Sequence, residues 1–313
     1  MATMKAVRIH SYGEPQLLIH EDAPRPTASA GEVLIRVHAV GVNPLDWKVR
    51  AGHLKGFLDY QLPMIPGWDV SGVVEAVGAD VPGFKAGDEV YGLLDFIRDG
   101  AYAQYVATQT KNIVHKPKSL DHVRSAAVPL ASLTAWQSLF DLANLSSGQT
   151  VLIHGAAGGV GHYAVQLAKW KGAKVIGTAS ARNSDFLREL GADEVIDYQI
   201  VRFEDAVSEV DVVFDTIGGE TQERSWKVLK KGGILVATLG VSSPDAPAKH
   251  GVRGEGLLVH PDAAQLMQIT ELIDARALKP MINTVLQLSE AAKAHELSQT
   301  GHVRGKIVLK VGD

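Results

Sequence analysis

The chain has no cysteine among its 313 residues. That absence excludes disulfides, thiolate zinc sites and cysteine nucleophiles. The twelve histidines are scattered, and neither His-Glu pair, at His20 and at His295, continues to the second histidine of an HExxH zinc helix. No GxSxG stretch suggests a serine hydrolase. We therefore expect neither a structural nor a catalytic metal ion.

Long apolar runs and an excess of positive charge are absent as well. No stretch approaches the ~20 apolar residues that a membrane span requires, and the N-terminal residues lack the apolar core of a signal peptide. The formal net charge is −4, with no sustained basic run. A nucleic-acid partner is therefore not expected. We expect a cytoplasmic protein that binds neither membrane nor nucleic acid.

The length of the chain, roughly twice that of a typical domain, predicts two domains. Its first part is punctuated by clusters of Gly, Pro and Asp, which is typical of an antiparallel β domain. Between these clusters, short strands are predicted at residues 31–40, 70–77, 88–93 and 101–108. The first of them alternates apolar and polar side chains, as a half-buried strand does. We assign residues 1–124 to the first part of this mostly-β domain.

Beyond about residue 120 the pattern changes to strands alternating with helical segments. This pattern is typical of a parallel sheet with helices on both faces. Strands are predicted at residues 150–154, 173–178, 194–197, 211–216 and 233–240. The helical segments that follow the first two strands stop at Gly172 and Gly191, which suit left-handed helix ends. We predict that residues 125–278 form a Rossmann α/β domain, a doubly wound parallel sheet.

The end of the chain returns to β structure. After a predicted helix at residues 261–277, strands are expected at residues 282–288 and 305–311, with a helix between them. We predict that residues 279–313 rejoin the mostly-β domain, which is then discontinuous.

The segment GAAGGVG, residues 155–161, lies between a predicted strand and an amphipathic helix. A diphosphate must be met by backbone N–H groups without side chains in the way, and glycines before a helix N-terminus allow this. The strand-helix context makes the glycine pattern specific. We predict that this loop binds the diphosphate of a dinucleotide; the alternative is a tight turn that holds no ligand. The predicted contacts are Gly155, Gly158, Gly159, Val160 and Gly161.

The residues after the second Rossmann strand favour NADPH over NADH. An NAD-binding fold usually has an acid there for the ribose 2′-hydroxyl. This chain reads GTASARNS at that point, with no acid before Asp185. Ser180, Arg182 and Asn183 can hydrogen-bond a 2′-phosphate, and Arg182 adds charge. Alternatively, Arg182 is an ordinary surface arginine.

Six motifs together resemble those of a known family. They are NPLDWKVRAG (residues 43–52), PGWDVSGVVEAVG (66–78), PGFKAGDEVYG (82–92), GAYAQYV (100–106), LTAWQSL (133–139) and GAAGGVG (155–161). In this order they are similar to the zinc-independent quinone oxidoreductases of the medium-chain dehydrogenase/reductase superfamily, over essentially the whole chain. The resemblance implies a GroES-like catalytic domain, a Rossmann domain, NADPH and usually a homodimer.

The resemblance also restricts the chemistry. Zinc alcohol dehydrogenases of this superfamily hold their metal with Cys and His, where this chain has Asn43 and Trp68. Without a Lewis acid, oxidation of an alcohol is disfavoured, whereas quinones, enones and alkenals accept hydride directly. Such acceptors need positioning and a donor to the developing enolate oxygen. The candidates are Asn43 and Lys48. Lys48 stands where the simplest quinone reductases carry a tyrosine, and in this respect the segment is more similar to the alkenal and enone reductases.

The Lys48 ammonium could stabilise the enolate and also supply the proton that completes the reduction. Two alternatives remain: Lys48 is a solvated surface lysine, or water delivers that proton in its place. Further residues are predicted by position. Trp47, Trp68 and Asp69 are candidates for a substrate pocket, although tryptophans are often core residues. By the resemblance, Thr134, Gly218, Leu239 and Gly240 lie toward the nicotinamide and Tyr198 toward the adenosine phosphate.

Three further features of the sequence leave alternatives open. The related alkenal reductases carry a lysine at the position of Asn183, so the preference for NADPH depends on Arg182. Residues 242–251 are either a substrate flap or a plain loop. The rival functions are an enoyl-thioester reductase and a non-enzymatic NADPH-binding protein.

Overall fold

The computed structural model describes residues 2–312, and these divide into two compact units. The β unit comprises the chain up to Leu130, His260–Arg276 and the chain from Pro280 onward. The Rossmann unit comprises Ala131–Val259 and Ala277–Lys279. We predicted boundaries after residues 124 and 278. The largest difference is that His260–Arg276, expected with the Rossmann domain, groups with the β unit.

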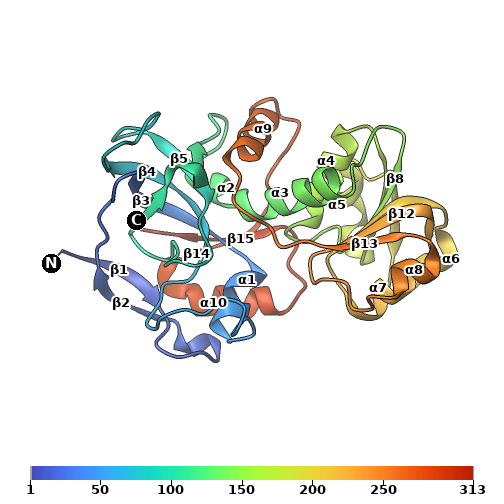
Figure 1. The fold of residues 1–313 in the computed structure, drawn as a ribbon, viewed down its shortest axis with the longest axis horizontal. Coiled ribbons are helices and arrows are strands. Elements are labelled where there is room, and N and C mark those ends of the chain that lie inside the picture. Colours follow the sequence, from blue (N-terminus) through green and yellow to red (C-terminus); the bar gives the residue numbers. More distant parts are fainter. Residues whose placement is uncertain (1, 313) are drawn as a thin grey trace. The chain divides into compact units, whose positions relative to one another are not determined.

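The β unit is built on a seven-stranded sheet of order β14-β15-β3-β4-β5-β7, with β6 paired to β3 (Figure 1). Its strands are β3 (Glu32–Val42), β4 (Asp69–Val77), β5 (Glu89–Leu93), β6 (Tyr105–Gln109), β7 (Ile113–His115), β14 (Ile282–Gln287) and β15 (Lys306–Lys310). A separate hairpin pairs β1 (Thr3–Arg8) with β2 (Ile19–Pro24). All pairs are antiparallel except β14 with β15.

The C-terminal strand β15 pairs with the N-terminal strand β3, with Val308 opposite Gly41. The predicted return of the chain to the β domain therefore occurs. Strand β3 differs from the half-buried strand that we expected, since only Arg36 in it is exposed. Helices α2 (His122–Ala126) and α10 (Ala291–Gln299) both contact this strand, which accounts for its burial. The other helices of the β unit are α1 (Pro44–Arg50) and α9 (Ala263–Asp274).

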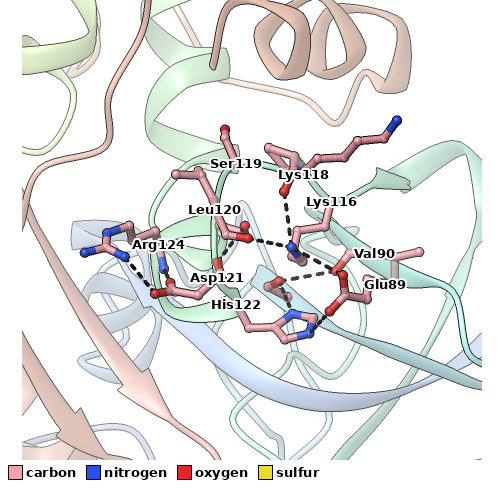
Figure 2. Close-up of polar contacts among 12 residues, drawn as sticks. Glu89, Val90, Lys116, Lys118, Ser119, Leu120, Asp121, His122 and Arg124 are labelled. Atoms are coloured by element: carbon pink, nitrogen blue, oxygen red, sulfur yellow. Dashed lines mark hydrogen bonds and ion pairs between the residues drawn. The ribbon is translucent and has the colours of Figure 1, made fainter. Parts of the chain in front are cut away.

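A polar cluster fixes the segment that leads into α2 (Figure 2). The ammonium of Lys116 donates to the carbonyl of Leu120 at 2.5 Å and lies 3.4 Å from Glu89. The same carboxylate lies 3.3 Å from His122, and Asp121 caps α2 through the Arg124 N–H. Burial and the neighbouring His38 ring lower the pKa of His122 to about 4. The cluster thus contains a neutral imidazole at ordinary pH and stabilises the connection between β7 and α2.

The Rossmann unit has a six-stranded parallel sheet of order β10-β9-β8-β11-β12-β13. Numbered along the unit, this is the order 3-2-1-4-5-6 of a dinucleotide fold. The strands are β8 (Thr150–His154), β9 (Lys174–Ala179), β10 (Glu194–Asp197), β11 (Val210–Asp215), β12 (Leu229–Ala237) and β13 (Arg253–Gly256). The predicted Rossmann domain is confirmed, and β8 and β10 have the predicted bounds.

Helices connect consecutive strands of this sheet (Figure 1). They are α4 (Gly161–Trp170), α5 (Ser184–Glu189), α6 (Phe203–Ala206), α7 (Gly219–Ser225) and α8 (Ala246–His250). Their apolar side chains bury a core against the sheet, with Trp226 and Phe203 among its largest members. Helix α3 (Pro129–Trp136) and the π-helical turn Gln137–Leu142 precede β8. No helix within residues 2–312 is both long and apolar enough to cross a membrane.

Candidate active site

Three of the four glycines of the predicted phosphate loop, Gly155, Gly158 and Gly161, differ in their surroundings. Gly155 follows β8 with φ of 66°, which an L side chain rarely adopts. A Cβ on Gly161, at the start of α4, would lie 2.3 Å from the Gly155 carbonyl oxygen. A Cβ on Gly158 would meet only that oxygen, at 3.2 Å. These are the three requirements of a diphosphate loop: a tight turn, close helix-strand packing and an open backbone surface.

The other residues of the loop fit the same use. Gly159 and Val160 are partly exposed, and Val160 is the N-cap of α4, so the helix N-terminus begins at the loop. The N–H groups of such a terminus and its dipole favour bound anions. The loop is therefore suited to a diphosphate.

The strand order of the Rossmann unit reverses between β8 and β11, and ligands bind at such switch points. There the Asp215 carboxylate accepts hydrogen bonds from the N–H groups of Ile217 (2.9 Å) and Gly218 (3.0 Å). The Gln222 amide donates to Asp215 (3.1 Å) and to the Gly240 carbonyl (3.0 Å). The structure thus brings the predicted Gly218 and Gly240 together through two side chains, Asp215 and Gln222, that the sequence did not single out.

Ile217 and Leu239 form an apolar ledge beside the phosphate loop. Their side chains are 52% and 54% exposed. A Cβ on Gly155 would lie 3.0 Å from Ile217 Cδ1, and a Cβ on Gly218 would lie 3.2 Å from Leu239 Cδ1. Leu239 was predicted and Ile217 was not. An exposed apolar pair next to an anion loop is suited to a flat ring whose phosphates bind that loop.

The residues predicted to bind the adenosine phosphate gather at the ends of β9 and β10. The N–H of Tyr198 donates to the Ala179 carbonyl at 3.3 Å, and the Asn183 amide lies 3.4 Å from the Ser180 hydroxyl. Arg182 lies exposed in the single helical turn Ala181–Asn183. Another predicted cofactor contact outside the loop, Thr134, is buried on α3.

In the β unit, Asn43 lies in a buried charged cluster. Its backbone N–H donates to Asp46 in the first turn of α1, and its side-chain amide donates to Asp69 at 2.8 Å. The ammonium of Lys306 donates to Asn43 Oδ1 and lies 3.4 Å from Asp69 Oδ2. The second Asp69 oxygen accepts the Leu130 N–H at 2.6 Å. Asn43 is thus held at both ends of its amide, and Lys306 and Asp46 were not predicted.

Lys48 is half-buried on α1, with its Nζ 5.8 Å from the centre of the Trp47 ring. It forms no ion pair with any residue between 2 and 312. Partial burial lowers the pKa of its ammonium. The indole N–H of Trp47 is buried without a hydrogen-bond partner in the described chain. Within the described chain, the Lys48 ammonium therefore has no ion-pair partner and the Trp47 indole N–H has no hydrogen-bond acceptor.

Trp68 and Asp69 are fully buried. The Trp68 ring packs against Tyr60 and Phe96, each with centroids 5.9 Å away, and the Tyr60 hydroxyl donates to the Phe96 carbonyl. We infer that Trp68 and Asp69 support the site from beneath its surface. Tyr60 and Phe96 come from two loops; Tyr60 is partly exposed, whereas Phe96 is buried.

Behind Asn43 the cluster continues from Asp46 to Tyr102 and His295. The Tyr102 hydroxyl lies 3.1 Å from Asp46 Oδ2 and 3.2 Å from His295 Nε2. Burial, with the Asp69 charge as a smaller cause, raises the pKa of Asp46 to about 7. Burial lowers the pKa of His295 to about 3. Near neutral pH the cluster therefore holds a neutral imidazole and a carboxyl that is partly protonated.

Asp46→Asn should change how stability depends on pH. The pKa of Asp46 rises from 3.8 to about 7 on folding, so the folded chain holds this proton more tightly. Its stabilising contribution is complete below the unfolded value and is lost as pH rises toward 7, by about 4 kcal/mol in all. Asparagine does not titrate. In urea unfolding, the stability of the variant relative to the unsubstituted protein should rise between about pH 4 and pH 7; two parallel curves would contradict the assignment.

The residues at the positions where zinc alcohol dehydrogenases hold their metal do not fit a metal ion. Asn43 and Trp68 supply no anionic or imidazole ligand, and the Lys306 ammonium already contacts Asn43 and Asp69. Among residues 2–312 there is no group of three or more His, Cys, Asp and Glu side chains that could hold a metal. The polar groups that this cluster does offer are amide N–H and ammonium donors.

Residues 242–251, a flap or a plain loop by sequence, contain the short helix α8. The Ser242 and Ser243 hydroxyls donate to Glu223 at 2.9 and 2.7 Å. The first residues of this segment are therefore tied to α7.

Comparison with known proteins places these features in a family. Residues 29–118 match the model of the alcohol dehydrogenase GroES-like domain, and residues 190–309 match that of a zinc-binding dehydrogenase. The chain is 36% identical to the 2-methylene-furan-3-one reductase of Solanum lycopersicum, over 98% of this chain and 79% of the relative. It is 35% identical, with the same coverage, to the chloroplastic NADPH-dependent alkenal/one oxidoreductase of Arabidopsis thaliana.

A solved structure supports the same placement. The quinone oxidoreductase from Coxiella burnetii superposes with a TM-score of 0.93 at 38% identity, over 99% of this chain and 100% of that one. The GroES-like and Rossmann units, the phosphate loop and these relatives agree. The chain belongs to the medium-chain dehydrogenase/reductase superfamily, in its branch of quinone oxidoreductases and alkenal/one reductases, which are NAD(P)H-dependent oxidoreductases.

Proposed function

We propose that this protein reduces quinones or α,β-unsaturated carbonyls with NADPH and without a metal ion. The observation that carries the proposal is the Asn43 amide, held by Lys306 and Asp69 where zinc relatives have a metal ligand. A site with an amide donor and ammonium groups but no metal ligands suits an acceptor that is already activated for hydride. The names of the tomato, Arabidopsis and Coxiella relatives support this substrate class.

The candidate residues of the two units have distinct roles in this proposal. Gly155, Gly158 and Gly161 hold the diphosphate, and the ledge of Ile217 and Leu239 supports the nicotinamide. NADPH supplies the hydride when it is bound. Asn43 Nδ2 and Lys48 Nζ stabilise negative charge on the acceptor oxygen, which is the carbonyl oxygen of an enone or quinone. The proton comes from Lys48 or from water.

Arg182→Asp should change the preference between the two nicotinamide cofactors. We propose that Ser180, Arg182 and Asn183 bind the 2′-phosphate, which NADH lacks. An aspartate there repels that phosphate, so the Kd for NADPH should rise at least about tenfold while the Kd for NADH stays the same or falls. Fluorescence titration with both cofactors measures this. Arg188→Asp, an exposed arginine on α5, is the matched control. Unchanged NADPH affinity in Arg182→Asp would remove Arg182 from the phosphate site.

The proposed function is tested by oxidation of NADPH with a panel of quinones, 2-alkenals, enones and an enoyl thioester. Turnover of at least one of the first three classes is expected, at rates above that of the thioester. Preference for the thioester would favour an enoyl-thioester reductase. NADPH binding without turnover of any acceptor would favour a non-enzymatic binding protein.

We further propose that the protein is a cytoplasmic homodimer. The edge strand β13 carries exposed residues and leaves one side of the sheet unpaired within the described chain, and such an edge can pair with a second copy. Light scattering should then give about twice the 33.5 kDa of one chain; a monomeric mass would contradict the dimer.

A further inference from the structure

Lys306 is a buried cation that contacts the Asn43 amide. It begins β15 and is 2% exposed, and its partners Asn43 and Asp69 are 1% and 0% exposed. The ammonium contacts Asn43 Oδ1 and lies 3.4 Å from Asp69 Oδ2. Three distant segments, the start of α1, the start of β4 and the start of β15, thus meet at one charged point.

The chemistry of these groups fixes the Asn43 amide in one orientation. An ammonium can only donate a hydrogen bond and an ionised carboxylate can only accept one. Asn43 must therefore turn Oδ1 to Lys306 and Nδ2 to Asp69, as the structure shows. One Nδ2 hydrogen is used by Asp69, and the second remains as a donor. A flipped amide would place Nδ2 against the ammonium and Oδ1 against the carboxylate.

The charge on Lys306 also affects the strength of that donor. A cation at the amide oxygen draws electron density from the nitrogen, so its N–H groups become stronger donors in a medium of low dielectric constant. Stability alone does not require this arrangement, since well-packed apolar side chains can replace a buried ion pair at little or no cost.

We propose that Lys306 is a positioning residue for the reduction: its ammonium, anchored by Asp69, orients and polarises the Asn43 amide so that Nδ2 donates to the acceptor carbonyl oxygen. A fixed protein cation thereby acts from behind the donor, where the zinc relatives use a metal ion on the substrate itself. This inference rests on the proposed function for its catalytic part, but the orientation of the amide can be measured without any substrate.

The first readout is the side-chain amide of Asn43 in the intact protein. Its two proton–nitrogen signals, assigned by their loss in Asn43→Ser, should be sharp and slow to exchange with solvent. In Lys306→Met, which keeps the length of the side chain and removes the charge, they should broaden or exchange at least about tenfold faster. Lys306→Arg should keep them. Signals unchanged in Lys306→Met would overturn the positioning role.

The second readout is turnover. Lys306→Met should lower kcat roughly ten- to hundredfold for alkenals and enones, with an unchanged Kd for NADPH, and Lys306→Arg should recover part of the loss. Lys310→Met, on the same strand but partly exposed, is the matched control and should keep full activity. A Lys306→Met protein that folds and keeps its kcat would overturn the proposal.

If that variant does not fold, Lys306→Met combined with Asp69→Asn removes both charges and is tested in the same way. If the unsubstituted protein never turns over but Lys306→Met loses the sharp amide signals, the proposed function is refuted and the positioning role of Lys306 stands.

Discussion

Gly158→Asp should lower the affinity for NADPH by at least about a hundredfold, or roughly 3 kcal/mol, while the protein stays folded. Within the described chain, a Cβ at this glycine meets only the Gly155 carbonyl oxygen, at 3.2 Å, and its φ is not in the left-handed region. The substitution therefore costs little in the fold. It places a side chain and a negative charge where the loop must approach a diphosphate. Isothermal titration with NADPH and a thermal melt measure the two effects.

Gly161→Ala is the contrasting control for this prediction. Its Cβ would lie 2.3 Å from the Gly155 oxygen and 2.7 Å from Ala156 Cα, both backbone atoms. The thermal midpoint should therefore fall by several degrees, in contrast to Gly158→Asp. Retained NADPH affinity in a folded Gly158→Asp protein would show that the loop does not hold the diphosphate.

Lys48→Met should lower kcat about ten- to hundredfold for quinones and enones, with little change in the Kd for NADPH. The ammonium is half-buried beside Trp47 and has no ion-pair partner within residues 2–312, so its charge is available to a substrate oxygen. Since burial lowers the pKa of Lys48, activity should decline on the basic side at a lower pH than an ordinary lysine would give. Steady-state rates across pH measure both effects.

Two variants define the meaning of that result. Lys48→Arg keeps the positive charge and should retain much of the activity. Lys55→Met removes an exposed lysine a few residues after α1 and should leave kcat unchanged. If Lys48→Met turns over as fast as the unsubstituted protein, Lys48 is a surface residue and the acceptor oxygen is stabilised by Asn43 and water.

The phosphate loop could be predicted because its determinants are local. Seven consecutive residues between a strand and a helix contain four glycines, of which Gly155, Gly158 and Gly161 each meet a different backbone requirement in the structure. Five of the six strands of the Rossmann sheet were predicted for the same reason, since their apolar runs are bounded by glycines and turns; β13 was not predicted. Domain boundaries were less accurate, because α9 contacts β7 of the β unit through pairing that no local pattern shows.

The catalytic cluster could be predicted only in part. Asn43 was found because a family motif marks its position, but its partner Lys306 lies 263 residues away and stands at the edge of an ordinary strand pattern. A lysine at such a place resembles a solvated strand end, but the fold buries it against Asn43 and Asp69. Asp69 contacts Asn43 through the fold as well, and the full burial of Trp68 and Asp69 could not be deduced from their motif.

In the proposed reaction, hydride passes directly from NADPH to a quinone or enone. A single-turnover measurement of NADPH oxidation tests this transfer, with the cofactor deuterated on either face of the nicotinamide carbon that carries the hydride. We predict that deuterium on one face slows the reaction by a primary isotope effect and that deuterium on the other face leaves the rate unchanged, since the ledge of Ile217 and Leu239 supports a single orientation of the ring. If neither label affects the rate with any quinone, enone or alkenal, or if bound NADPH is never oxidised, the claim is wrong.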